Sequence, residues 1–199
     1  MNMKGDKCDI HVALAADDNY FEGLLTTAWT IAKYATEPER IVFEVLDGGI
    51  TEEHRSFFER KIREKGSCCR FHPIDQESSF KGFREYHGAS RMTYARLLLP
   101  QLLEDVDQVV YSDVDMAWFA DVVELWDGLD DDAVMHVSSR GSYVGEAERQ
   151  SFDEAGFRYS EGKYFIAGMI VMNLARAIFQ RNSWPFAICG CMPMLSADR

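Results

Sequence analysis

The sequence predicts an α/β fold in which helices cover both faces of a mostly parallel central sheet. Apolar runs at 10–16, 41–46 and 108–112 alternate with segments whose apolar residues recur at helical spacing. Alternating strands and helices are typical of parallel sheets that are covered on both sides. The runs at 10–16 and 108–112 each lead into a pair of aspartates, so we expect both acidic turns at the same edge of the sheet.

The first part of the chain predicts two strand–helix units. Residues 10–16 form a buried strand, and residues 21–34 form a helix with one apolar face. Residues 41–46 form the next strand and end in an Asp-Gly-Gly turn signal. A second helix runs to about residue 65, with Thr51 in its capping position and a glycine directly after it.

The rest of the chain continues this alternation with longer loops. Residues 68–74 predict a third strand, 75–89 a polar loop, and 90–103 a helix that Pro100 ends or kinks. We expect the following further elements: a strand at 108–112, a helical turn at 122–126, a strand at 133–138, a long polar loop at 140–163, and a strand over 164–173 interrupted by Ala167-Gly168. Long loops in compact domains usually serve function.

Composition narrows the class of protein. A chain of 199 residues suits one domain, and its net charge of −12 argues against nucleic acid as a partner. No apolar run approaches the ~18 residues that a transmembrane helix needs, and the polar start of the chain lacks a signal-peptide core. The five cysteines stand at irregular positions and favour reduced thiols. We therefore expect a cytoplasmic protein without a transmembrane segment.

Asp113 and Asp115 form the most informative motif. They follow the strand at 108–112, and residues two apart in extended backbone point the same way, so both carboxylates can converge on one cation. Carboxylate oxygens suit Mg²⁺ or Mn²⁺. An Asp-x-Asp alone is more often a simple strand-ending turn. A second acidic turn, Asp17-Asp18, follows the strand at 10–16. Two acidic turns at one edge of the sheet favour a ligand site that both turns share.

The chain lacks the glycine-rich motifs that bind phosphates through backbone amides. No G-x-G-x-x-G follows the first strand, and no G-x-x-x-x-G-K-[ST] occurs in the sequence. A dinucleotide fold or a P-loop is therefore not predicted. A site with few glycines and many acids would hold a nucleotide diphosphate through a metal ion.

Five short motifs, in order between residues 9 and 181, resemble glycosyltransferase family 8. This family contains retaining galactosyl- and glucosyltransferases of bacterial lipopolysaccharide assembly and their glycogenin relatives. The matching segments are Ala15-Ala16-Asp17-Asp18-Asn19-Tyr20, Thr93-Tyr94-Ala95-Arg96-Leu97, Val109-Val110-Tyr111-Ser112-Asp113-Val114-Asp115, Leu125-Trp126-Asp127, and Tyr164-Phe165-Ile166-Ala167-Gly168-Met169 with Asn173-Leu174 after it.

The resemblance implies a Rossmann-like fold called GT-A and a metal-dependent retaining transfer of a hexose. It further implies UDP-glucose or UDP-galactose as donor, a saccharide or glycolipid as acceptor, and Mn²⁺ or Mg²⁺ as cofactor. On this basis we expect a nucleotide-sugar-binding domain over residues 8–181 and an atypical, poorly packed tail over 182–199. The basic tail of full-length members would add peripheral contact with a membrane.

The resemblance also implies roles for individual residues. Asp113 and Asp115 match the metal ligands, Asp17 matches the position that reads the uracil edge, and Arg96 matches a basic residue near the donor sugar and phosphates. No residue is assigned a catalytic role. The residues expected to bind the donor are Ala15, Asp17, Asn19, Tyr20, Arg96, Asp113, Val114, Asp115, Ala167 and Gly168.

The chain departs from the family at two places. Ile166 stands where members carry an asparagine that contacts the donor sugar, and isoleucine has no hydrogen-bonding group. The chain also lacks the later Asp-Gln-Asp motif and the histidine that completes the metal site in the family. We therefore expect a C-terminally truncated form that binds the donor weakly and transfers sugar slowly or not at all.

Two other functions remain as alternatives at this point. The chain could be a non-catalytic remnant that binds a UDP-sugar, or a phosphotransferase or nucleotidyltransferase that uses paired aspartates and Mg²⁺. Without the family resemblance, Arg96 would fit a surface ion pair on a helix better than a ligand contact.

Overall fold

The computed structural model describes residues 9–83, 90–130, 132–139 and 165–177. Their strands form one sheet in the order β3-β2-β1-β4-β6-β5. The strands are β1 (Ile10–Ala16), β2 (Ile41–Asp47), β3 (Cys68–Pro73), β4 (Gln108–Ser112), β5 (Met135–Ser139) and β6 (Phe165–Asn173). Strands β1 to β4 are parallel, whereas β6 runs antiparallel to both β4 and β5, which confirms a mostly parallel sheet.

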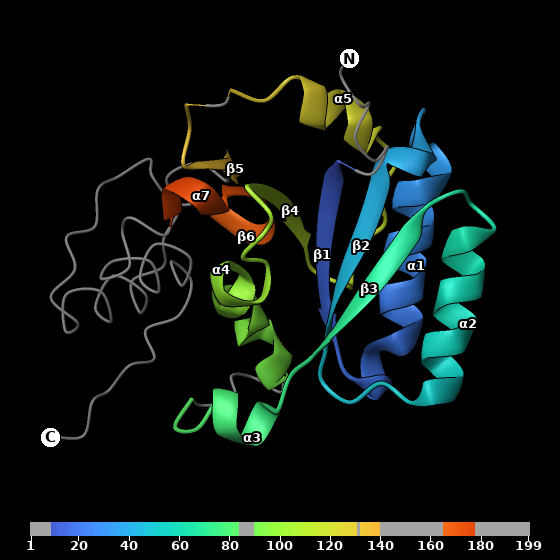
Figure 1. Ribbon diagram of the computed structural model, residues 1–199, viewed down its shortest axis with the longest axis vertical. Helices are drawn as coiled ribbons and strands as arrows, with labels where there is room; N and C mark the ends of the chain where they lie inside the picture. The colour runs from blue at the N-terminus through green and yellow to red at the C-terminus, as the bar shows by residue number, and fades with distance from the viewer. Residues whose placement is uncertain (1–8, 84–89, 131, 140–164, 178–199) are drawn as a thin grey trace, which may run out of the picture.

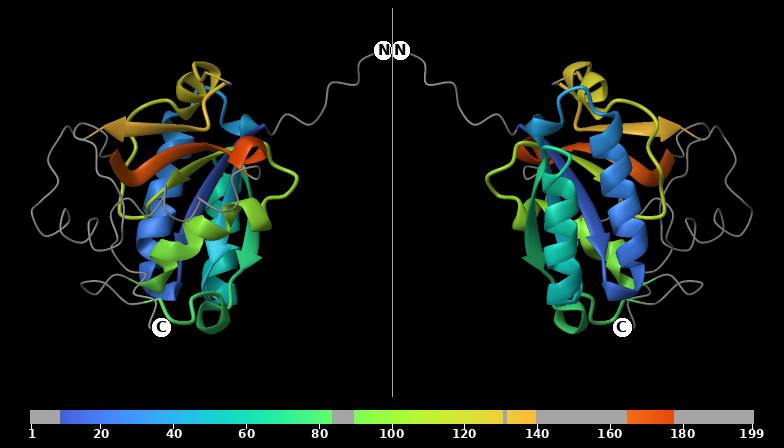
Figure 2. Two further views of the ribbon diagram at one scale, coloured as in Figure 1. Left: turned by 90° about the vertical axis from the view of Figure 1, so that its left-hand side faces the viewer. Right: turned by 90° about the vertical axis from the view of Figure 1, so that its right-hand side faces the viewer.

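Helices cover both faces of this sheet, as the sequence predicts. Helices α1 (Phe21–Tyr34) and α2 (Glu52–Arg63) lie on one face, while the 3-10 helix η3 (Arg91–Leu98) and α4 (Leu99–Leu102) lie on the other. The two turned views of Figure 2 show α1 and α2 in front of the sheet from one side and α4 from the other. The shorter helices are η1 (Asp18–Tyr20), η2 (Pro38–Arg40), α3 (Gln76–Ser79), α5 (Val122–Asp127) and α7 (Leu174–Ala177).

Each face of the sheet has its own apolar core. Helices α1 and α2 lie side by side next to β1, β2 and β3 (Figure 1). The core on their side of the sheet contains Leu24 of α1, Phe43 of β2 and Phe58 of α2. Tyr111 of β4 and Leu99 of α4 belong to the core on the opposite side. Burial on both faces explains why these parallel strands have nearly continuous apolar sequences rather than alternating ones.

Three sequence-based predictions need correction. The polar loop at 75–89 contains the short helix α3, which Asp75 caps by accepting from the N–H of Glu77. The helix predicted at 90–103 is the 3-10 helix η3 followed by α4, because apolar spacing alone does not separate the two helix types. Pro100 lies in the first turn of α4, where its missing N–H costs nothing.

β6 runs as one strand from Phe165 to Asn173, and the predicted interruption at Ala167-Gly168 takes the form of a register shift against β5. The N–H of Asp113 donates to the carbonyl of Gly168 at 2.7 Å, which continues the pairing of β6 with the β4 segment. Against β5, however, Val137 pairs with Ile170 and the next residue, Ser138, pairs with Ile166. Residues 167–169 of β6 therefore bulge out of the pairing with β5. The predicted loop at 140–163 and the predicted tail at 182–199 lie outside the described residues.

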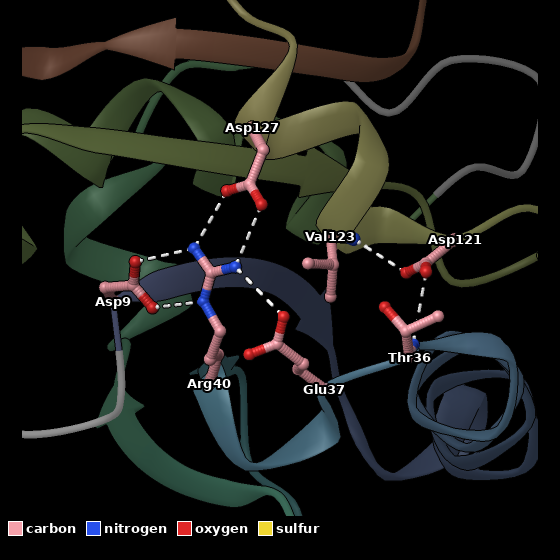
Figure 3. Close-up of polar contacts among 7 residues, drawn as sticks. All are labelled: Asp9, Thr36, Glu37, Arg40, Asp121, Val123 and Asp127. Carbon is pink, nitrogen blue, oxygen red and sulfur yellow. Dashed lines mark hydrogen bonds and ion pairs between the residues drawn. The ribbon is translucent and has the colours of Figure 1, made fainter.

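Arg40 joins three segments at the end of the sheet where β1 begins (Figure 3). Its guanidinium donates to both carboxylate oxygens of Asp9 and to both of Asp127, at 2.8 to 3.0 Å. Nearby, Asp121 caps α5 and accepts from the N–H of Thr36 at 3.2 Å. These contacts attach α5 to the chain that enters β1 and β2. None of the helices in the described ranges is long and apolar enough to cross a membrane.

Candidate functional site

The two acidic turns lie at the same edge of the sheet, as predicted. β1 and β4 are parallel neighbours, and their register pairs Leu14 with Ser112. Asp17 follows β1 and Asp113 follows β4, so both turns stand at the carboxyl ends of adjacent strands. In open α/β sheets, ligands bind at this edge.

The first turn uses its two aspartates differently. Asp18 faces α2, where it accepts from the N–H and hydroxyl of Thr51 and from His54. The backbone hydrogen bond from Thr51, followed by the one from His54, holds the pKa of Asp18 below its usual range. Asp17 caps η1 by accepting from the N–H of Asn19 at 3.0 Å, and its other oxygen accepts from the Ser90 hydroxyl at 3.1 Å.

These bonds fix Asp17 without using all of its acceptor capacity, because each carboxylate oxygen can accept more than one hydrogen bond. Asn19 is exposed beside it, and the ring of Tyr20 is 42% exposed. An exposed ring next to a fixed carboxylate can stack on a planar base while the carboxylate accepts from its edge. The sequence did not identify Ser90 as part of this turn.

The second turn differs from the strand geometry assumed in the prediction. β4 ends at Ser112, and Val114 and Asp115 form a turn rather than extended backbone. The relative placement of Asp113 and Asp115 therefore follows from the turn and its anchors, not from strand alternation. Asp115 is exposed, and Asp113 retains about a third of its side-chain exposure (33%).

Helix α1 and the side chain of Trp118 hold this second turn in place. The hydroxyl of Thr27, a buried residue, donates to the carbonyl of Met116 at 2.6 Å. The indole of Trp118 donates to the Ser112 hydroxyl at 3.1 Å. At Gly23 the helix approaches so closely that an added Cβ would lie 2.5 Å from the carbonyl oxygen of Val114. A glycine inside a helical sequence was the available signal for this close approach.

Asp113 is held by Arg96 and Tyr111 on one of its two oxygens. Oδ1 accepts from Nη2 of Arg96 at 2.9 Å and from the Tyr111 hydroxyl at 3.0 Å. Burial raises the pKa of Tyr111 well above its usual range, so this hydroxyl stays protonated and donates. Among the described residues, no hydrogen bond reaches Oδ2 of Asp113.

Arg96 is a buried part of the site rather than a surface ion pair, since only 7% of it is exposed. Its guanidinium lies over the Tyr111 ring, 4.6 Å from the centroid. It also donates to the carbonyl and hydroxyl of Thr93 and to the carbonyl of Ala167. Arg96 therefore connects η3, β4 and β6 while it contacts Asp113.

The other predicted donor contacts are mostly enclosed. Ala15 lies in the core beside η3 and is only 7% exposed. The carbonyl of Val114 packs on α1, and that of Ala167 accepts from Arg96. Ile166, by contrast, is 42% exposed, although it is a large apolar side chain.

Within the described part of the chain, the second acidic turn offers a cation the two carboxylates of Asp113 and Asp115. No group of three or more histidine, cysteine or acidic side chains suited to a metal occurs among the residues that the structure describes. Asp113 and Asp115 supply hard oxygen ligands, and Oδ2 of Asp113 accepts no hydrogen bond from the described residues. This set fits Mg²⁺ or Mn²⁺, which commonly bind through one or two carboxylates and complete their shell with phosphate oxygens and water.

The chain is similar in sequence and in structure to known glycosyltransferases. Residues 11–181 match the model of glycosyl transferase family 8. The crystal structure of the galactosyltransferase LgtC in complex with donor and acceptor sugar analogues superposes with a TM-score of 0.72 and 31% identity, over 92% of this chain and 66% of that one. The mixed sheet and its helices are those of the GT-A fold.

Two curated relatives are more distant in sequence. A Haemophilus influenzae protein named as a glycosyltransferase is 26% identical over 181 residues, which is 87% of this chain and 52% of that protein. General stress protein A of Bacillus subtilis is 23% identical over 167 residues, which is 82% of this chain and 56% of that protein. The chain thus spans about half the length of the curated relatives it matches.

Proposed function

Because the chain belongs to glycosyl transferase family 8, we propose that it binds a UDP-sugar and a divalent cation at the edge formed by its two acidic turns. The donor is UDP-glucose or UDP-galactose, and the acceptor is a saccharide or a glycolipid such as a lipopolysaccharide precursor. Transfer retains the anomeric configuration. The five cysteines stand at irregular positions, which suits a reducing compartment, and we propose the cytoplasm as the site of the reaction.

The observation that carries this proposal is the arrangement of Asp113. Arg96 and Tyr111 fix one oxygen, and the other has no hydrogen bond within the described residues. A carboxylate held in this way needs little reorganisation when it binds a cation. Asp115 stands two residues further along in the same turn and is exposed.

The chemistry of a nucleotide-sugar suits this edge. A bound divalent cation would stabilise the negative charge that develops on the departing diphosphate. The side chains themselves bind and orient. Asp17 accepts from the base edge, Tyr20 stacks on the base, and Arg96 adds positive charge beside Asp113.

The metal assignment is tested by nucleotide binding with Asp113→Asn and Asp115→Asn. Both variants should lose the increase in UDP affinity that Mn²⁺ produces, measured by calorimetry with and without EDTA. Asp105→Asn is a matched control, since Asp105 is exposed and precedes β4 at the opposite edge of the sheet. Normal Mn²⁺-dependent binding in both site variants would refute the assignment.

The base preference is tested with Asp17→Asn. Asparagine can still cap η1, but it replaces one acceptor oxygen with an amide donor that cannot accept from the uracil N–H. The ratio of UDP to CDP affinity should therefore fall, since an unpaired polar group in a site discriminates strongly. Equal affinity of the unmodified protein for UDP and CDP would contradict a base contact by Asp17.

Donor binding without transfer is the second candidate, and the exposed Ile166 favours it. This apolar side chain lies beside Gly168, where an added Cβ would be 3.8 Å from Cγ2 of Ile166, and it cannot hydrogen-bond a sugar hydroxyl. Purified protein, Mn²⁺, either donor and a panel of saccharides distinguish the two functions. Turnover on the order of 1 s⁻¹ indicates an ordinary enzyme, whereas UDP binding without transfer indicates a binding protein.

A further inference from the structure

We propose that Tyr111 is a positioning residue that restricts Asp113 to one metal-binding oxygen, Oδ2. This inference rests on the proposed function, because it assumes a cation at Asp113. It adds that the cation contact is monodentate and that the hydroxyl of Tyr111 keeps it so.

The placement of Tyr111 follows from the strand. Tyr111 lies in β4 two residues before Asp113, and it pairs with Ile170 of β6 across the sheet. Its side chain is 2% exposed in the core beside η3, and its hydroxyl reaches Oδ1 of Asp113 at 3.0 Å. A buried hydroxyl needs a partner, and here the partner is the candidate metal ligand.

Arg96 makes the restriction stronger because it donates to the same oxygen at 2.9 Å. Two donors on Oδ1 leave it little capacity for a cation, while Oδ2 has none among the residues described. Oδ2 lies toward Gly168, where an added Cβ would be 3.2 Å away. The absence of a side chain at Gly168 keeps the approach to Oδ2 open.

The consequence is a preference among cations. Mg²⁺ and Mn²⁺ favour octahedral shells with single contacts to each carboxylate, whereas Ca²⁺ takes six to eight ligands and often binds carboxylates through both oxygens. An aspartate restricted to one oxygen therefore disfavours Ca²⁺. Tyr111 would thus contribute to ion selectivity without touching the ion.

The test is Tyr111→Phe, with Tyr34→Phe as the matched control. Both changes remove one phenol hydroxyl, and Tyr34 is 39% exposed on α1, away from the acidic turns. Mn²⁺ affinity in the presence of UDP is measured by electron paramagnetic resonance, and Ca²⁺ affinity by displacement of Mn²⁺. In Tyr111→Phe, Mn²⁺ affinity should fall about 10-fold, as is typical when a residue that orients a metal ligand is removed.

Without the Tyr111 hydroxyl, Oδ1 of Asp113 has one hydrogen-bond donor fewer and can contact Ca²⁺ more readily. Ca²⁺ affinity should therefore fall less than Mn²⁺ affinity, and the ratio of Mn²⁺ affinity to Ca²⁺ affinity should decrease. A residue with a merely structural role would weaken both ions equally. Equal losses, or a Tyr111→Phe variant that matches Tyr34→Phe, would overturn this inference while the proposed function stands. No Mn²⁺-dependent UDP binding in the unmodified protein would instead overturn the proposed function and this inference with it.

Discussion

Asp113 and Gly168 face each other where β4 passes into the acidic turn. The N–H of Asp113 donates to the carbonyl of Gly168 at 2.7 Å, and a Cβ at residue 168 would lie 3.2 Å from Oδ2 of Asp113. The backbone of β6 at Gly168 thus lies next to Oδ2 of Asp113. The other oxygen, Oδ1, is held by Arg96 and Tyr111. Asp113 has little freedom to move away from a larger residue at this position.

Gly168→Ala should therefore weaken the cation site more than the fold. The added methyl group presses on Oδ2, and we expect Mn²⁺ affinity to fall about 10-fold. The free energy of unfolding should change little, because the strain is offset by the roughly 0.4–1 kcal/mol gained when alanine restricts the unfolded chain. Calorimetric Mn²⁺ titration and thermal unfolding measure the two effects. Unchanged Mn²⁺ affinity would show that Oδ2 is not the coordinating atom.

Gly23→Ala should destabilise the protein, although the helix propensities of glycine and alanine alone predict that this change in α1 is stabilising. In an exposed helix interior alanine is about 1 kcal/mol better than glycine. Here the new Cβ would meet the Val114 carbonyl at 2.5 Å, and backbone in an anchored turn cannot yield cheaply. We expect a loss of about 1–3 kcal/mol, as for overpacked cores, together with weaker Mn²⁺-dependent UDP binding. Chemical denaturation gives the sign, and a stabilised variant would contradict the close approach.

Arg40→Lys should lower stability without changing nucleotide binding. Lysine keeps the charge but cannot make paired hydrogen bonds to both Asp9 and Asp127. The hydrogen bonds from Arg40 hold the pKa values of these two aspartates below their usual range. A depressed native pKa stabilises the fold above the unfolded pKa, so the difference between the two proteins should shrink as the pH falls below about 4.

The stability lost in Arg40→Lys should be small, because the side chains of Asp9 and Asp127 are about half exposed, at 51% and 54%. It should be smaller than the stability lost in the Glu44→Gln variant that is described below. UDP affinity serves as the internal control, since Arg40 lies at the opposite end of β1 from the acidic turns. A marked fall in UDP affinity would mean that this cluster also supports the site.

Glu44 is a fully buried carboxylate in the middle of β2. It accepts from His11 at 2.8 Å and His72 at 2.7 Å, which lie on the strands to either side, and Arg70 is 3.3 Å away. Burial alone would raise the pKa of Glu44. The hydrogen bonds from both histidines and the charge of Arg70 outweigh burial and lower the pKa to about 2.

Glu44→Gln should cost roughly 2–4 kcal/mol at neutral pH, because it leaves buried donors without a charged partner. The native pKa of about 2 lies below the ordinary value of 4.5, so this stabilisation is complete above pH 4.5 and disappears as the pH falls toward 2. Urea unfolding at several pH values measures it, with the exposed Glu104→Gln as control. A difference that persists unchanged at pH 2 would contradict the assigned ionisation.

The sequence by itself determined the order of the elements and the edge of the sheet at which the candidate site lies. Mostly apolar runs such as 41–46 are typical of strands buried on both faces, and helical spacing at 21–34 indicates a helix with one apolar face against them. Parallel connection through a helix then places the residues after β1 and β4 at one edge. Asp17 and Asp113 were found for this reason, since the argument needs only local pattern and chain direction.

Tertiary structure decided which carboxylate oxygens of Asp17 and Asp113 form hydrogen bonds within the protein and which do not. The direction of β6 and the type of helix at η3 depend on long-range packing, which local spacing does not encode. The same holds for Tyr111, whose apolar pattern predicts only a core residue, yet whose hydroxyl reaches Asp113. Hydrogen bonds between segments such as Arg96 and Ala167, 71 residues apart, exist only once the chain has folded. The sequence therefore placed the carboxylates, and packing selected the oxygen that remains open.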